Sequence, residues 1–262
     1  MPKIAITGKG GVGKTTLAAL LAHIYAEAGQ SVIAIDADPA ASLPYALGLP
    51  DDLLAQLTPI AEMEDLIYER TGAKPGTVGG FFTLNPRVDD IPDRFSVTHR
   101  GIRLLQLGTI SAGGSGCICP ESAILKALVT HVILYRNEVM ILDMEAGLEH
   151  LGRAPAGAVD AFLIVVEPGR RSLSTAQAIQ RLAADIGVKT CLVVGNKVRG
   201  EADRDFIRRA LPDSLPVIGF LSADPRAVEA DMRGEAIFDA APQLLAEARE
   251  IVAAFERATG PR

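Results

Sequence analysis

Residues 8–16 read GKGGVGKTT and could bind the phosphates of a nucleotide. Their spacing is that of a phosphate-binding loop, in which two glycines separated by four residues precede a lysine and a serine or threonine. Glycine lets backbone N–H groups turn towards an anion, and a following helix would direct its positive N-terminal end at it. In such a loop Lys14 would neutralise the β- and γ-phosphates, Thr15 would hold Mg²⁺ and Thr16 would bond a phosphate nearer the sugar. The alternative is a plain glycine turn between a strand and a helix.

Three aspartates could act on those phosphates. Asp36 and Asp38 follow the apolar run at residues 31–35, and Asp143 follows a later apolar run and begins an Asp-x-x-x-Gly pattern that ends at Gly147. In a parallel sheet the carboxyl ends of the strands meet at one edge, where ligands bind. A carboxylate there can orient the attacking water or hold a water bound to Mg²⁺, and Asp143 has the form of such a magnesium-binding acid. Alternatively, Asp36 or Asp38 merely caps the next turn.

A possible contact to the base follows another apolar run, residues 190–195. The amide of Asn196 could donate to and accept from the edge of a purine. The Asn-Lys-x-Asp pattern that selects guanine is absent, because position 199 is arginine. We therefore expect adenine rather than guanine.

Cys117 and Cys119 lie in a glycine-rich loop directly before Pro120 and a helical pattern. Proline suits the first position of a helix, so Cys119 would lie at its N-cap, where the helix end favours a thiolate. We expect both cysteines to be exposed. Two sulfurs cannot complete a four-coordinate site for a soft metal, whereas a two-fold dimer would supply four. A redox pair or two incidental thiols are the alternatives. Cys191 lies within an apolar run and is interpreted as a core residue.

Short apolar runs alternate with helical patterns along the chain. This alternation predicts a mostly parallel central sheet of about seven strands with helices on both faces, as in P-loop NTPases. A single helix is expected over residues 52–70 and a surface excursion over residues 72–100. With 262 residues, 48% of them hydrophobic, we expect one domain over residues 1–262.

The overall charge bears on possible partners. A net charge of −6 argues against a general nucleic-acid or anionic-membrane surface, because such surfaces depend on clustered lysine and arginine. The first strand starts almost at Met1, and no apolar run approaches about twenty residues. We therefore expect a soluble, cytoplasmic protein that binds neither nucleic acid nor membrane.

The phosphate-binding loop with its second lysine, Lys9, is similar to the deviant Walker A loop of the ATPases that include MinD, ParA and the nitrogenase iron protein. Together with Asp36-Ala37-Asp38-Pro39, the Asn-Pro-x-Val-Asp-Asp-Ile-Pro-Asp run at residues 85–93 and the Gly-Cys-Ile-Cys-Pro-Glu segment, it resembles the CooC-type nickel-insertion ATPases of carbon monoxide dehydrogenase maturation. The resemblance covers nearly the whole chain. It implies a homodimer that binds one Ni²⁺ or Zn²⁺ between its two Cys-x-Cys pairs and couples ATP hydrolysis to delivery of nickel to the apo-enzyme.

The resemblance also implies roles for single residues. Lys9 would cross the dimer to the partner's ATP, although by itself it could equally be solvated. Asp38 would position the attacking water, Asp36 would support the metal and phosphate network, and Asp224 would lie in the loop that flanks the base. The expected site residues are Lys9, Lys14 and Asp38 for catalysis; Gly10, Gly11, Val12, Gly13, Lys14, Thr15, Thr16, Asn196 and Asp224 for nucleotide; Thr15, Asp36 and Asp143 for magnesium; and Cys117 and Cys119 for the transferred metal.

Two rival functions use the same residues. Four thiolates from a dimer could also hold an iron–sulfur cluster, which would make the protein a cluster carrier of the same ATPase class. A positional switch that binds DNA or membrane in its ATP state, as ParA and MinD do, is the other rival. The acidic net charge and the absence of a basic amphipathic tail disfavour that second rival.

Overall fold

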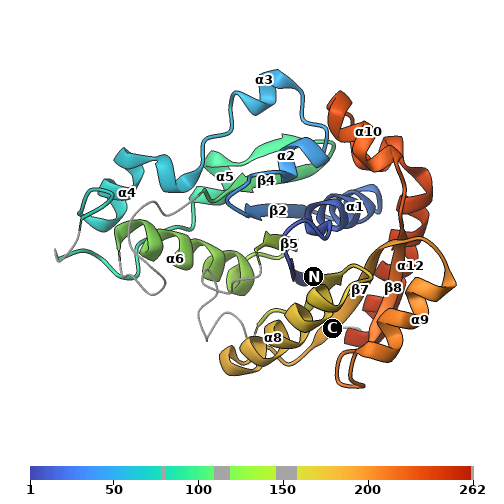
Figure 1. The fold of residues 1–262 in the computed structure, drawn as a ribbon. Coiled ribbons are helices and arrows are strands. Elements are labelled where there is room, and N and C mark those ends of the chain that lie inside the picture. Colours follow the sequence, from blue (N-terminus) through green and yellow to red (C-terminus); the bar gives the residue numbers. More distant parts are fainter. Residues whose placement is uncertain (78–80, 109–118, 146–157, 261–262) are drawn as a thin grey trace.

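The computed structural model describes residues 1–77, 81–108, 119–145 and 158–260 (Figure 1). Cys117 and Gly147 lie outside the described residues. Within the described part, eight strands form one sheet in the order β3-β4-β2-β5-β1-β6-β7-β8. The strands are β1 (Lys3–Gly8), β2 (Val32–Ala37), β3 (Val97–His99), β4 (Ile102–Gln106), β5 (Val139–Met144), β6 (Ala161–Val166), β7 (Cys191–Val198) and β8 (Val217–Ser222).

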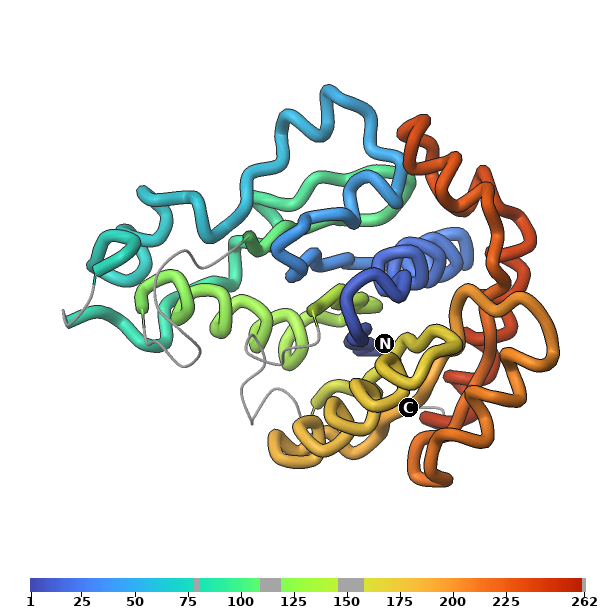
Figure 2. The backbone as a smooth tube through the Cα atoms, viewed as in Figure 1, coloured from blue at the N-terminus to red at the C-terminus, as the bar shows by residue number. Residues whose placement is uncertain are grey.

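Strand β3 pairs antiparallel with β4, and the other neighbouring strands of this sheet pair parallel. This confirms the predicted mostly parallel α/β fold, with one strand more than the expected seven or so. The additional strand is β3, which lies in the stretch expected to be a surface excursion. In Figure 2 the blue segment that contains β1 lies between the green segments and the orange and red segments.

Helices cover both faces of the sheet. Along β1, Ile4 and Ile6 belong to one buried cluster and Ala5 to the other, as the alternation of side chains along a strand requires. The first face carries α1 (Lys14–Glu27), α2 (Leu43–Ala46), α10 (Arg226–Arg233), α11 (Ile237–Ala240) and α12 (Pro242–Thr259). The second carries α4 (Glu64–Thr71), α5 (Ile91–Phe95), α6 (Pro120–Tyr135), α8 (Arg170–Ile186) and α9 (Glu201–Ala210).

The prediction of one helix over residues 52–70 is wrong. The chain there forms α3 (Asp51–Leu54), a 3₁₀ turn (Ile60–Glu62) and α4. Pro59 lacks the N–H that a helix needs, and its ring disfavours the helical conformation of Thr58 before it. The break therefore falls where the proline lies.

Strand order brings the polar ends of several strands together. β1 lies between β5 and β6, and β5 lies between β1 and β2. In the register of the sheet, Asp143 is paired with both Ile6 and Asp36. The phosphate-binding loop, which follows β1, therefore starts beside the acidic ends of β2 and β5. No described helix is long and apolar enough to span a membrane.

Candidate functional site

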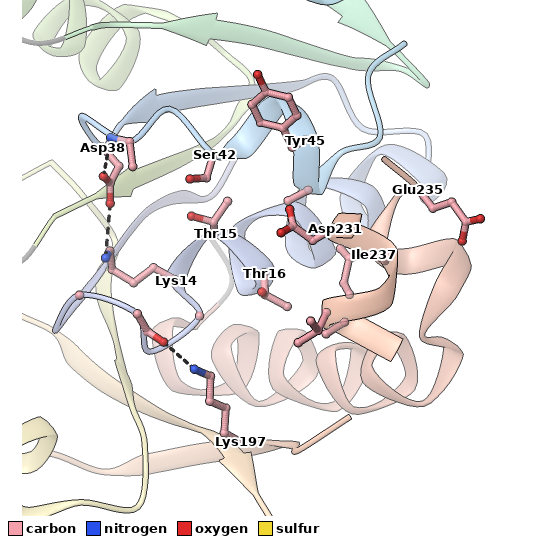
Figure 3. Close-up of a pocket in the computed structure, with 18 of the residues that line it drawn as sticks. Lys14, Thr15, Thr16, Asp38, Ser42, Tyr45, Lys197, Asp231, Glu235 and Ile237 are labelled. Carbon is pink, nitrogen blue, oxygen red and sulfur yellow. Dashed lines mark hydrogen bonds and ion pairs between the residues drawn. The ribbon is translucent and has the colours of Figure 1, made fainter. Parts of the chain in front are cut away.

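The phosphate-binding loop lies at the edge of a cavity of about 710 Å³ (Figure 3). Side chains of the loop and of the segment after β2 line one part of it, and α10 and α11 line another. The lining residues include Gly10, Gly11, Gly13, Lys14, Thr15, Thr16, Asp38, Tyr45, Lys197, Val228, Asp231 and Ile237. A cavity beside a phosphate-binding loop and a helix N-terminus has the form of a nucleotide site.

The loop has the backbone conformation that its glycines allow. Gly11 and Gly13 have φ values of +77° and +94°, in the left-handed region where glycine is favoured. A Cβ atom added to Gly13 would lie 2.1 Å from Nδ2 of Asn196. Glycine is therefore required at position 13 for its backbone conformation and for the space it leaves.

Thr15 and Asp143 meet as the prediction of a magnesium site requires. The Thr15 hydroxyl donates to Oδ2 of Asp143 at 2.6 Å. Asp143 is fully buried, and its Oδ1 has no hydrogen-bond partner among the described residues. Burial raises the pKa of Asp143 to about 7. A hydroxyl and a buried carboxylate with one unused oxygen fit a hard divalent cation such as Mg²⁺.

Asp36 is also buried, and burial raises its pKa to about 6. Its two carboxylate oxygens accept the backbone N–H groups of Asp38 and Leu43 at 3.1 and 3.0 Å. These bonds fit the alternative in which Asp36 organises the turn that follows β2. A contact of Asp36 with bound Mg²⁺ and phosphate stays a prediction.

Lys14 and Asp38 lie together at the mouth of the loop. The Lys14 ammonium is 3.4 Å from Oδ2 of Asp38, and both side chains are largely buried (Figure 3). A phosphate that binds Lys14 would have to compete with this carboxylate. Binding of nucleotide would therefore release Asp38 for another partner, such as a water molecule.

Lys9 does not line the cavity described above. Its ammonium is 3.5 Å from Oε1 of Glu167, which directly follows β6, and the Lys9 side chain is 39% exposed. Sequence reasoning missed Glu167, although it is a carboxylate after an apolar run, as Asp36 and Asp143 are. The exposed position leaves Lys9 accessible to a second molecule.

Asn196 is buried, and its amide is bound to the protein. Nδ2 donates to the carbonyl of Val12 at 2.7 Å, and Oδ1 accepts the N–H of Lys197 at 2.8 Å. Asp224 likewise binds the guanidinium of Arg226 at 2.6 Å. Contacts of Asn196 and Asp224 with a base stay predictions.

Cys119 caps α6, as predicted. Its Sγ accepts the N–H of Ser122 at 3.4 Å, and Pro120 is the first residue of the helix. Contrary to expectation, the Cys119 side chain is buried, with 2% exposed, because the whole first turn of α6 is buried. Within the described ranges no group of three or more His, Cys, Asp or Glu side chains could hold a metal ion.

Cys191 lies at the start of β7 and packs against the core on the α6 side. Burial raises its pKa to about 11, so its thiol stays protonated at neutral pH. Cys191 is only partly buried, so it lies at the edge of the core rather than within it.

Asp143→Asn is expected to stabilise the nucleotide-free protein, most of all at high pH. The raised pKa of Asp143 means that the folded chain holds this proton more tightly than the unfolded chain. Its contribution to stability is therefore present at low pH and is lost as pH rises from about 4 to about 7. Asparagine cannot ionise, so the advantage of the variant in free energy of unfolding should grow by on the order of 2 kcal/mol between pH 5 and pH 8. Urea unfolding in the presence of a chelator measures this, and a pH-independent difference would contradict it.

The fold and this site define an ATPase of the P-loop class. The model of the CobQ/CobB/MinD/ParA nucleotide binding domain matches residues 3–237, and the chain belongs to that family. The chain is 46% identical over 259 residues to the carbon monoxide dehydrogenase accessory protein CooC of Rhodospirillum rubrum, across 99% of this chain and 98% of that protein. It is 45% identical to an uncharacterized ATP-binding protein of Methanocaldococcus jannaschii, across 90% of each chain. These relatives confirm the resemblance to the CooC-type ATPases.

Solved structures agree on the fold. A chain of the MinC:MinD cell division protein complex of Aquifex aeolicus covers 100% of this chain and 97% of its own length, with a TM-score of 0.68 and 22% identity. A putative plasmid partition protein of Borrelia burgdorferi, solved with AMPPNP, has a TM-score of 0.69 and 16% identity across 98% of this chain and 100% of its own. At these identities the likeness concerns the fold alone.

Proposed function

We propose that the protein is a dimeric metallochaperone that couples binding and hydrolysis of Mg-ATP to insertion of nickel into carbon monoxide dehydrogenase. The observation that carries the proposal is the similarity, over nearly the full length of both chains, to an accessory protein of that enzyme. We also infer that residues 1–262 act as one ATPase domain in the cytoplasm, with one sheet that contains strands from Lys3 to Ser222.

In this proposal a few residues bind the phosphates and Mg²⁺ and orient the attacking water. Lys14 and the backbone of the loop bind the phosphates, while Thr15 and Asp143 hold Mg²⁺. When bound, Mg²⁺ would neutralise the charge that develops on the phosphates. Asp38, freed from Lys14 by the arriving phosphate, would orient the attacking water. The ion pair between Lys14 and Asp38 supports this exchange of partners.

Lys9 would act in the dimer. Its ammonium is held by Glu167 and is partly exposed. Exchange of an exposed ion pair costs little free energy, because such pairs contribute about 1 kcal/mol or less. Lys9 could therefore leave Glu167 for the phosphates of the partner's ATP.

The nickel would be cargo held by Cys117 and Cys119 of both subunits. Soft thiolate ligands suit Ni²⁺ and Zn²⁺, and four sulfurs are available only if two chains meet. The N–H of Ser122 donates to Cys119 Sγ and would also stabilise its thiolate. Charge at the ATP sites would draw the subunits together and change the geometry of the shared metal site.

The proposal is tested by activation of apo carbon monoxide dehydrogenase with limiting Ni²⁺. Wild-type protein with Mg-ATP should speed the appearance of activity, and Cys119→Ser should remove this effect while it retains ATPase activity. Equal activation by the variant and the wild type would contradict the proposal. Anaerobically purified protein that contains stoichiometric iron and sulfide would instead favour a cluster carrier.

A further inference from the structure

The end of strand β7 holds two consecutive carbonyl groups of the phosphate-binding loop. Asn196 donates to the carbonyl of Val12, and the ammonium of Lys197 donates to the carbonyl of Gly11 at 2.6 Å. Figure 3 shows Lys197 directed at the loop from the side opposite Asp38. Lys197 also lines the cavity, and no role has been given to it above.

These bonds orient the N–H groups that follow. In a trans peptide the C=O of one residue and the N–H of the next point in opposite directions. A donor that holds the Gly11 carbonyl therefore directs the N–H of Val12 away from β7, and that N–H donates to the carbonyl of Lys9 at 3.4 Å, which closes a turn of the loop. Likewise, the Asn196 amide that holds the Val12 carbonyl directs the N–H of Gly13 away from β7. The Lys197 contact therefore supports the turn of the loop, and the Asn196 contact orients an N–H group of the kind that such a loop offers to phosphate.

The backbone is strained at Lys197, the residue that makes this contact. Its φ is +56°, in the left-handed region, which is unfavourable for a residue other than glycine. The pairing of β7 with β8 shifts register between Gly195 and Val198, a type of irregularity that redirects side chains. Glycine would relieve the strain but would lose the ammonium that reaches the loop. Strained residues of this kind concentrate at functional sites.

We propose that Lys197 is a positioning residue for nucleotide binding, which holds the Gly11 carbonyl and keeps the phosphate-binding loop in its binding conformation before nucleotide arrives. This role concerns the ATPase site and is independent of nickel. The contact is exposed to solvent, so its expected contribution is moderate.

The test compares Lys197→Met, Lys197→Arg and Lys197→Gly with the control Lys189→Met, an exposed lysine that precedes the same strand. In Lys197→Met the Kd for Mg-ADP should rise about three- to tenfold, and arginine should restore most of the affinity because it is again a donor. Lys197→Gly should show the same rise in Kd as Lys197→Met. Its Tm should nevertheless equal or exceed that of the wild type, because glycine relieves the strained backbone. Lys189→Met should bind as the wild type does.

Hydrogen exchange without nucleotide separates positioning from direct contact with the ligand. If Lys197 orders the loop, amides of residues 9–14 should exchange faster in Lys197→Met than in the wild type. Lower affinity with unchanged exchange would overturn the proposal, because the ammonium would then act on the ligand alone. Wild-type affinity in a folded Lys197→Met protein would also overturn it, as would a parallel fall of Tm and affinity that arginine does not restore.

Discussion

Lys14→Met should abolish ATP hydrolysis and weaken binding of Mg-ATP by about 100-fold. Lys14 is the first residue of α1 and is largely buried beside the cavity. There its ammonium would form charge-assisted hydrogen bonds with phosphate, which are among the strong hydrogen bonds of proteins. Methionine keeps the length of the side chain but offers no charge. Calorimetric titration with Mg-ATP and a phosphate-release assay measure the two effects.

Lys9→Met is the matched control, since it removes the other lysine of the same loop. Lys9 points to Glu167 outside the cavity, so Mg-ATP should bind within about twofold of the wild-type affinity. Hydrolysis should nevertheless fall if Lys9 acts across the dimer. Wild-type affinity for Mg-ATP in Lys14→Met would refute the assignment of the phosphate site. Wild-type turnover in Lys9→Met would refute the role of Lys9 in the partner's site.

Cys119→Ser should remove tight binding of nickel. In a two-fold dimer this one change replaces two of four sulfur ligands by hydroxyl groups, which are poor ligands for soft divalent metals. The cap of α6 should persist, because serine is a good N-cap residue and can accept the same N–H of Ser122. We therefore expect a loss of nickel binding with little loss of stability. Equilibrium dialysis measures the bound metal, and thermal unfolding followed by circular dichroism measures the stability.

Much of the fold was predictable because its signals are local. The phosphate-binding loop, the apolar runs and the helical patterns each depend on neighbouring residues, and they predicted the parallel sheet correctly. β3 was missed because a strand of three residues in a polar stretch has too few positions to show alternation. The prediction of one helix over residues 52–70 was wrong because Pro59 interrupts the apolar pattern on which it was based.

The site was predictable as far as strand order decides it. Thr15 meets Asp143 and Lys14 meets Asp38 because parallel strands deliver their carboxyl ends to one edge. The left-handed backbone of Lys197 was not predictable, since lysine carries no preference for it. The burial of Cys119 depends on how α6 packs on the sheet, which a Cys-x-Cys pattern does not contain.

Equilibrium titration with Ni²⁺, together with measurement of oligomer mass, tests the central claim most directly. The wild type and Cys191→Ser should bind one ion per two chains, and Cys117→Ser and Cys119→Ser should each lose tight binding. Affinity in the wild type should fall as pH is lowered, because protons compete for the sulfur ligands. One ion per monomer, or undiminished binding by either Cys117→Ser or Cys119→Ser, would contradict a nickel site shared between two subunits.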